Sequence, residues 1–400
     1  MMKIKIADGI HFVGILNPNL RIFDIIMKTD YGTSYNSYVV EGTEHTALIE
    51  TAHATFFEEY LEKINDVTDI SKIDYIVLNH TEPDHTGSLR RILELNPEIE
   101  VIGSMAAIKY AKKIANLDFK SRVVKDGEEL DLGGKTLRFL IAPFLHWPDS
   151  MFTYLKEDKI LFSCDMFGCH YCEPRIWDKH ITYTDKYDDA FAYYYAAIFG
   201  PFKEFVLKGL DKIKDLDISI IAPSHGPVIA ARVKEVQEKY RAMSETGMRK
   251  NPVKKVLILY VSAYGCTGKM AETIQQTLES AGQFDISMRN VIHHDLMQLK
   301  EEIESADALF IGSPTINRDA LKPIWDVLSV TDAVLNAGKP VGVFGSFGWS
   351  GEAVKMLVER LRSLKLNVVG EGIRANFVPS EEELAAVSEY AKEILPLLAN

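Results

Sequence analysis

The segment His80-Thr-Glu82-Pro-Asp84-His85 places four side chains that can bind a metal within six positions, directly after the apolar run that ends at Leu78. Carboxylates and imidazoles of this density are hard to explain as core packing, because such groups are rarely buried without partners. The segment therefore predicts a metal site at the end of a buried strand. Its glutamate is the member that decides which metal to expect.

Three further candidates follow other apolar runs: His146, Asp165 and His225. Loops at the carboxyl ends of strands commonly form the active site of an α/β fold, so these side chains are expected to meet the first group. Seven ligands are too many for one tetrahedral ion but are natural for two metals. Asp165 is the expected bridge, because the two oxygens of one carboxylate can span two cations.

The elements that must position these residues are strands at 38–40, 45–50, 73–78, 99–102, 135–141, 159–162 and 218–222. Helices are expected at 55–64, 110–115, 188–214 and 233–243, and a linker at 244–252. Regular alternation follows, with strands at 255–261, 285–290, 308–311, 340–344 and 366–369 and helices at 268–281, 321–330, 350–364 and 380–395. This pattern predicts one domain over 1–250 and a doubly wound parallel sheet over 251–400.

The second domain opens with a strand, the loop Ser262-Ala-Tyr-Gly-Cys-Thr267 and a helix. Hydroxyls and backbone N–H groups at such a turn form an anion cradle, although a serine-rich helix cap is the alternative for this loop alone. The loop contains no lysine and is not a Walker A motif. Two later loops, 312–317 and 345–351, end the third and fourth strands, and Trp349 offers an aromatic face.

With the first motif, the segments 145–150 and 163–168 resemble the flavodiiron proteins, whose first domain has the metallo-β-lactamase fold. Hydrolases of that fold have histidine where this chain has Glu82, and a carboxylate there favours iron over zinc. The resemblance implies one iron on His80, Glu82 and His146, another on Asp84, His85 and His225, and Asp165 between them. It also implies that His170 and Tyr195 orient ligands or donate hydrogen bonds to substrate.

The second domain resembles flavodoxin, which implies an FMN site. The residues expected to bind FMN are Ser262, Ala263, Tyr264, Gly265, Cys266, Thr267, Pro314, Thr315, Ile316, Asn317, Ser346, Phe347, Gly348, Trp349, Ser350 and Gly351. The expected fold class is therefore α/β: a metallo-β-lactamase-like αββα sandwich followed by a flavodoxin-like sheet. Both likenesses, in this order, cover essentially the whole chain.

The resemblance implies a reductase that converts O2 to water, NO to N2O, or both, with FMN relaying electrons to two irons. Reduced rubredoxin or the deazaflavin coenzyme F420 in its reduced form, F420H2, is the expected donor. A head-to-tail homodimer, or a pair of such dimers, would bring one subunit's FMN to the other's irons. The alternatives are a dinuclear metallo-hydrolase with an accessory flavodoxin domain, and a non-catalytic electron-transfer or gas-sensing module.

The composition agrees with a cytoplasmic enzyme. The net charge of −12 argues against a nucleic-acid partner, and neither a membrane-spanning stretch nor a signal peptide is recognisable. Four cysteines are too few for a disulfide scaffold in 400 residues. Cys164, Cys169 and Cys172 have the spacing of part of an iron–sulfur site, with Cys266 as a fourth, but buried thiols are the preferred interpretation.

Overall fold

The computed structural model describes residues 4–247 and 251–398. The chain forms two compact units, residues 1–249 and 250–400. The predicted linker at 244–252 lies partly outside the described residues, at 248–250, and its first residues belong to helix α7 (Val233–Gly247). No helix in the described ranges is both long and apolar enough to cross a membrane.

Two sheets lie face to face in the first unit, a seven-stranded sheet and a five-stranded sheet. The larger sheet has the order β1 (Ile4–Ala7), β2 (Ile10–Phe12), β7 (Tyr38–Glu41), β8 (Thr46–Ile49), β9 (Tyr75–Leu78), β10 (Glu100–Gly103) and β11 (Lys120–Val123). The smaller sheet has the order β12 (Glu129–Asp131), β13 (Thr136–Ile141), β14 (Met151–Leu155), β15 (Ile160–Cys164) and β16 (Ile220–Pro223).

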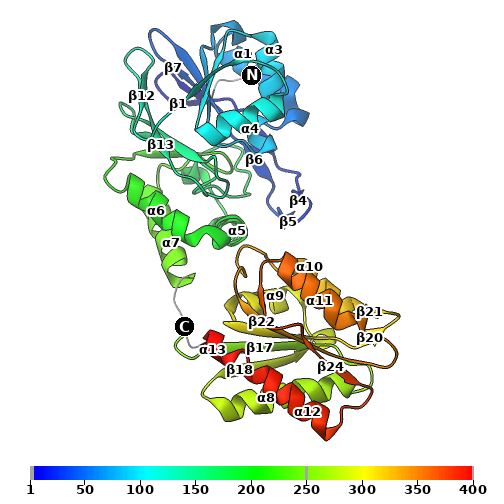
Figure 1. The fold of residues 1–400 in the computed structure, drawn as a ribbon. Helices are drawn as coiled ribbons and strands as arrows, with labels where there is room; N and C mark the ends of the chain where they lie inside the picture. Colours follow the sequence, from blue (N-terminus) through cyan, green and yellow to red (C-terminus); the bar gives the residue numbers. More distant parts are fainter. Residues whose placement is uncertain (1–3, 248–250, 399–400) are drawn as a thin grey trace. The chain divides into compact units, whose positions relative to one another are not determined.

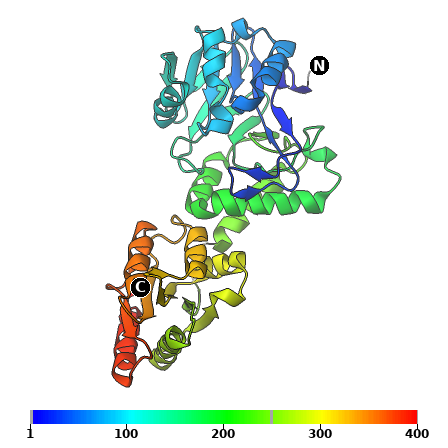
Figure 2. The same ribbon diagram turned by 90° about the vertical axis from the view of Figure 1, so that its right-hand side faces the viewer.

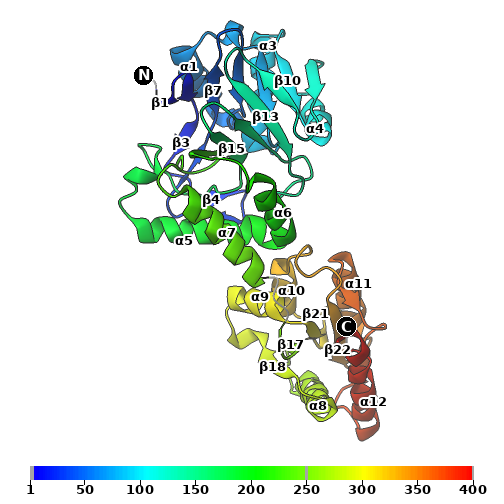
Figure 3. The ribbon, with the colours of Figure 1, turned by 90° about the vertical axis from the view of Figure 1, so that its left-hand side faces the viewer.

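Helices cover the outer face of each sheet of the first unit (Figures 1 and 3). One group comprises α1 (Phe57–Val67), α2 (Pro83–Thr86), α3 (Leu89–Leu95) and α4 (Met105–Ala115); the other comprises α5 (Thr184–Tyr194), α6 (Lys203–Ile213) and α7. Apolar residues of the two inner faces, such as Val40 and Phe162, form the core between the sheets. The predicted αββα sandwich is confirmed.

The expected helix over 188–214 is broken. Helix α5 ends at Tyr194, and the wide turn η4 (Tyr195–Phe199) and the tight turn η5 (Gly200–Phe202) precede α6. Pro201 has no N–H to continue the helical ladder, which explains why regular helix stops before it. The break also turns α6 onto α7.

Two small antiparallel sheets were not predicted: β3 (Ile15–Asn17) with β6 (Thr33–Tyr35), and, between them in the chain, the hairpin of β4 (Ile22–Phe23) with β5 (Met27–Lys28). The β4–β5 turn places Asp24 and Ile25 in the left-handed region. Figure 2 shows this dark-blue hairpin beside the green helix α5. The exposed fractions of Ile25 and Ile26 are 91% and 84%, which is unusual for large apolar side chains.

The second unit has one six-stranded sheet in which β17 and β19 are central. Its order is β18 (Asp285–Asn290), β17 (Lys255–Tyr260), β19 (Ala308–Gly312), β22 (Pro340–Phe347) and β23 (Asn367–Val368), with β24 (Ile373–Asn376) also paired to β22. Every pair in this sheet is parallel. The strand expected over 366–369 is β23, whereas β24 was not predicted.

Helices cover both faces of this sheet (Figure 1). Helices α8 (Cys266–Ala281) and α12 (Glu381–Lys392) pack on one face, and α9 (Leu296–Ser305), α10 (Lys322–Val330) and α11 (Glu352–Ser363) on the other. The short hairpin β20 (Thr315–Ile316) and β21 (Asp319–Ala320) and the last helix α13 (Leu395–Leu398) complete the unit. The predicted flavodoxin-like sheet is confirmed, whereas α9 and the β20–β21 hairpin were not predicted.

Candidate functional site

The seven side chains predicted to bind metal lie together at one edge of the sandwich. His80 and Glu82 follow β9, Asp165 follows β15 and His225 follows β16, while His146 is in the loop between β13 and β14. The short helix α2 carries Asp84 and His85 in its single turn, and Pro83 at its start has no N–H to leave unpaired. A backbone hydrogen bond from Met151 N to Asn79 O joins the two sheets beside this edge.

The two oxygens of Asp165 face two different sets of ligands. Oδ2 lies 3.2 Å from His146 Nε2 and 3.7 Å from His80 Nε2. Oδ1 lies 3.3 Å from His85 Nε2 and 3.4 Å from His225 Nε2. The arrangement is that of a carboxylate between two cation sites.

Each of the two sets of ligands contains one further carboxylate. Glu82 Oε2 lies 3.2 Å from the Nε2 atoms of both His80 and His146. Asp84 Oδ2 lies 3.0 Å from His225 Nε2, and Asp84 Oδ1 lies 3.4 Å from His85 Nε2. Two compact sets could each hold a metal ion: His80, Glu82, His85 and Asp165, and Asp84, His85 and His225. His85 belongs to both sets.

Hydrogen bonds behind the rings fix which nitrogen faces the centre. His225 Nδ1 donates to Ser34 O at 2.6 Å, since a carbonyl can only accept. His80 Nδ1 lies 3.3 Å from both oxygens of Asp149, which also accepts from Thr81 N and Thr81 Oγ1 at 2.7 Å. Both rings therefore direct Nε2 at the centre, as metal-binding histidines require.

Electrostatics hold the carboxylates ionised. Burial raises the pKa of Asp165, but His85 and His146 outweigh it and hold the pKa well below its usual value. Burial lowers the pKa of His85, but Asp84 and Asp165 outweigh this and raise it to about 10. The cluster is built to surround positive charge, which protons on the imidazoles or metal ions can supply.

The polar atoms of the cluster fit two metal ions. Both carboxylate oxygens of Asp84, Asp165 Oδ1 and His85 Nε2 are buried and make no hydrogen bond within the described residues. Such atoms are costly to bury unless a further group satisfies them. Two ions bound by imidazoles and carboxylates would do so, and a donor set of nitrogen and oxygen suits iron.

His170 lies beside this cluster, as predicted, and its ring centroid is 5.2 Å from that of His225. Its Nδ1 lies 2.9 Å from Thr33 Oγ1, and its Nε2 is buried without a hydrogen-bond partner. Burial lowers the pKa of His170 to about 3, so the ring is neutral at ordinary pH.

Tyr195 does not face the cluster. Its Oη lies 2.6 Å from Ser244 Oγ, and its ring packs on Tyr240. The neighbouring Tyr194 faces the cluster instead, with its ring edge-on to His170 at 4.9 Å between centroids. Burial, and then Asp165, raise the pKa of Tyr194 well above its usual value, so its hydroxyl keeps its proton.

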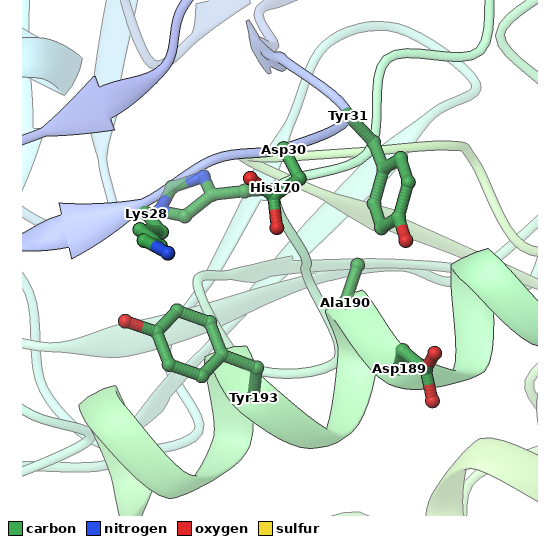
Figure 4. Close-up of a pocket in the computed structure, with 7 residues that line it drawn as sticks. All are labelled: Lys28, Asp30, Tyr31, His170, Asp189, Ala190 and Tyr193. Carbon is green, nitrogen blue, oxygen red and sulfur yellow. The ribbon is translucent and has the colours of Figure 1, made fainter. Parts of the chain in front are cut away.

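A cavity of about 300 Å³ borders His170 between the β4–β5 hairpin and α5. Figure 4 shows the side chains that line it: Lys28, Asp30, Tyr31, His170, Asp189, Ala190 and Tyr193. The same hairpin carries Asp24, whose carboxyl group interacts with that of Glu82. Burial, and then Glu82, raise the pKa of Asp24 to about 6. No sequence pattern marked Asp24, because its two-residue strands are too short to show a period.

In the second unit, the predicted FMN loops form a cleft at the carboxyl end of the sheet. The predicted residues that line it are Ser262, Ala263, Tyr264, Cys266, Pro314, Thr315, Ile316, Ser346, Phe347 and Gly348. Ser262 Oγ accepts a hydrogen bond from Gly268 N at 3.2 Å, at the start of α8. The loop thus places hydroxyls at a helix N-terminus, where an anion binds.

The other six predicted residues do not line the cleft: Gly265, Thr267, Asn317, Trp349, Ser350 and Gly351. Thr267 Oγ1 lies 2.8 Å from Ser346 Oγ and is buried, so it supports a lining residue. Trp349 follows the lining residue Gly348 in the chain, and its exposed fraction is 95%. Phe377, which follows β24, lines the cleft and was not predicted.

The cysteines are free thiols. Cys164 and Cys169 are buried, and burial raises the pKa of both. Cys266 lies in the second unit and lines the cleft there. Cys164 and Cys169 agree with the preferred interpretation of buried thiols, whereas Cys172 and Cys266 are only partly buried.

Comparisons with known proteins match both units. A family model described as ODP family beta lactamase matches residues 33–226, and one described as Flavodoxin matches residues 258–390. Flavo-diiron protein FprA2 of Clostridium acetobutylicum is 50% identical over 400 residues, covering 98% of this chain and 99% of that protein. Nitric oxide reductase of Moorella thermoacetica is 35% identical over 402 residues and covers 99% of each chain. The solved structure of rubredoxin oxygen:oxidoreductase from Desulfovibrio gigas, 31% identical, has a TM-score of 0.70 and covers 100% of this chain and 99% of that one.

The lactamase-like sandwich with a two-metal carboxylate–histidine cluster, joined to a flavodoxin-like unit, defines a class of flavin- and metal-dependent oxidoreductases. The chain belongs to the flavodiiron protein family. It is an oxidoreductase whose cofactors are FMN and a non-haem diiron centre.

Proposed function

We propose that this enzyme reduces O2 to water, NO to N2O, or both, with electrons from reduced rubredoxin or F420H2. The main support for the proposal is that the two carboxylate oxygens of Asp165 face two different sets of candidate ligands. Each set contains one further carboxylate, Glu82 or Asp84. A dizinc hydrolase has no need of a carboxylate in place of the second motif histidine, so the donor set supports iron.

In the proposed site, one iron is held by His80, Glu82 and His146 and the other by Asp84, His85 and His225, with Asp165 as the bridge. When bound, the two irons supply electrons to a small diatomic molecule, and FMN supplies them from the donor. Asp149 and Ser34 hold His80 and His225 in the tautomer that presents Nε2. The fixed orientation of these two rings would keep both sets of ligands in place when the irons change oxidation state.

Both reductions consume protons as well as electrons: four of each for O2, and two of each for a pair of NO molecules. The buried cluster therefore needs nearby O–H or N–H donors. Tyr194 and His170 pack together beside the ligands, and both are neutral. We assign Tyr194, rather than Tyr195, the role of donating a hydrogen bond to the substrate.

The FMN site is proposed at the cleft of the second unit. The 262–267 loop would hold the phosphate through Ser262 Oγ and backbone N–H groups at the start of α8. The loops at 314–317 and 346–351 would border the flavin ring. Thr267 would act by positioning Ser346.

We further propose a head-to-tail homodimer, or a pair of such dimers, in the cytoplasm. Large apolar side chains are exposed on both units. Ile25 and Ile26 lie on the hairpin beside the metal cluster. Tyr264 and Trp349, with exposed fractions of 91% and 95%, lie on the loops of the cleft. Exposed apolar clusters of this kind mark interaction surfaces. In a two-fold dimer the cleft of one copy would cover the hairpin of the other, and each FMN would meet a diiron centre.

The deciding experiment is the iron, zinc and FMN content of anaerobically purified protein, followed by rates with each substrate. About two irons and one FMN per chain, with O2 or NO consumption on addition of reduced rubredoxin or F420H2, are expected. Zinc without flavin, in protein made with iron available, would overturn the proposal. If O2 or NO is consumed with an artificial reductant but with neither proposed donor, only the choice of donors is rejected.

A further inference from the structure

Phe377 stands at the flavin cleft in a position that packing within the unit does not explain. It follows β24 directly, and 62% of its surface is exposed. Its side chain lines the cleft together with Phe347 and Gly348. An aromatic ring of this size usually buries most of its surface, so its exposure points to a missing partner.

The backbone of Phe377 is held in an unfavourable conformation. Its φ is 53°, in the left-handed region that large side chains avoid. Phe377 N donates to Phe347 O at 2.8 Å, and Asn376 N donates to Glu383 Oε1 at 2.9 Å. These bonds tie the segment to β22 and to the start of α12. Strain that surrounding bonds enforce is typical of functional positions.

The ring of Phe377 lies directly over Gly348. A Cβ atom added at Gly348 would come within 2.9 Å of Phe377 Cε1 and 3.1 Å of Cζ. The ring can occupy this place only because position 348 has no side chain. The end of β22 and the end of β24 therefore fit together to fix one aromatic face at the cleft.

We propose that Phe377 binds the isoalloxazine ring of FMN, as an aromatic wall of the cleft. This inference rests on the proposed FMN site and adds a contact from the loop after β24. The anionic phosphate belongs with the hydroxyls of the 262–267 loop, whereas a phenyl ring suits the flat, apolar part of the ligand. Because hydrogen bonds from Asn376 N and Phe377 N already hold the backbone of this segment, little backbone entropy is lost when the flavin binds.

The test is a titration of full-length apoprotein with FMN, followed by flavin fluorescence. Phe377→Ala and Phe377→Leu should each raise the Kd about tenfold, because aromatic stacking is lost while the fold is kept in at least the leucine variant. Phe377→Tyr should bind within twofold of the parent. Val378→Ala is the matched control, since Val378 is equally exposed (61%) but does not line the cleft, and its Kd should not change.

A second variant displaces the ring without removing it. Gly348→Ala puts a methyl group where Phe377 Cε1 and Cζ lie, and should weaken FMN binding in the same direction. Adding Phe377→Ala to Gly348→Ala should then cost little more, because the ring is already displaced.

The inference is overturned if folded Phe377→Leu binds FMN as tightly as the parent while Thr267→Ala binds it about fivefold more weakly. If the parent apoprotein itself fails to bind FMN, the proposed FMN site is wrong and the inference falls with it. These outcomes separate an error in the assignment of Phe377 from an error in the proposed function.

Discussion

His80 Nδ1 lies 3.3 Å from the Asp149 carboxylate, on the side of the ring opposite to Glu82, whose Oε2 is 3.2 Å from Nε2. Asp149 and His80 are both buried, and Thr81 donates twice to the same carboxylate. The pKa of Asp149 is lowered despite its burial, chiefly because His80 donates to it. This carboxylate therefore orients the candidate ligand His80 and does not itself belong to the cluster.

Asp149→Asn should weaken iron binding while preserving the fold. The amide keeps the shape of the carboxylate but loses its charge, and one of its two ends can only donate. Loss of such an outer partner typically costs about 10- to 100-fold in metal affinity. Competition with an iron chelator measures the effect. Asp126→Asn, which removes a carboxylate paired with Lys212 on the surface, should leave iron affinity unchanged.

Glu82→His should shift the centre from iron toward zinc. The variant replaces a hard oxygen ligand by an imidazole and restores the pattern of the lactamase-like hydrolases. We expect the iron-to-zinc ratio of protein grown with both metals to fall about tenfold, a difference of about 1.4 kcal/mol in relative affinity. Asp189→Asn, on the cavity beside His170, is the control. Unchanged iron content and reductase rate in Glu82→His would refute the ligand assignment.

The gathering of the candidate metal ligands at one edge was predictable from sequence because each follows a strand with a clear apolar run, as His80 follows β9. The tyrosine that faces the cluster was not predictable in this way. Tyr193, Tyr194 and Tyr195 are consecutive, and each step along a helix turns the side chain by about 100°. A family resemblance cannot resolve a one-residue shift where the helix opens into the wide turn η4. Only the three-dimensional structure shows that the ring of Tyr194 faces His170.

The residues missed altogether lie on very short strands. Asp24 belongs to a hairpin of two-residue strands, and Phe377 follows the four-residue β24. Segments of this length show no reliable period. Phe377 reaches its site through the pairing of β24 with the distant strand β22, whereas Asp24 lies in a local turn that no apolar run marks.

Thr267→Ala should lower FMN occupancy and leave iron unaffected. The hydroxyl does not line the cleft but bonds with Ser346, which does. Loss of one buried hydrogen bond is worth about 1 kcal/mol, so the FMN Kd should rise roughly fivefold. Thr273→Ala, on the exposed side of the same helix, is the matched control. Equal FMN content in the two variants would contradict the role of Thr267.

Glu50 gives a pH-dependent prediction for protein stripped of metal. Burial raises its pKa from 4.5 to about 8, and its Oε2 has no hydrogen-bond partner in the described structure. The folded state therefore binds the proton more tightly than the unfolded state. The resulting stabilisation is complete below pH 4.5 and is lost as pH rises through about 8.

Glu50→Gln removes this dependence, because the amide stays neutral. Urea unfolding should show the variant gaining stability relative to the parent between pH 5 and 9, by at most roughly 4 kcal/mol. Glu98→Gln, an exposed glutamate paired with Lys120, should not show the gain. A parent stability that rises over this pH range, relative to Glu50→Gln, would exclude a protonated Glu50.

Variants of the adjacent residues Tyr194 and Tyr195 distinguish a role in substrate binding from a role in packing. Tyr194→Phe removes the hydroxyl that we place beside the cluster, and should lower turnover with an artificial reductant about tenfold or more. Iron and FMN content should stay the same, since Tyr194 is not among the proposed ligands. Tyr195→Phe removes only the hydrogen bond with Ser244, and should cost about 1 kcal/mol of stability with turnover unchanged. The reverse result, with turnover lost only in Tyr195→Phe, would restore the role that the family resemblance gave to Tyr195.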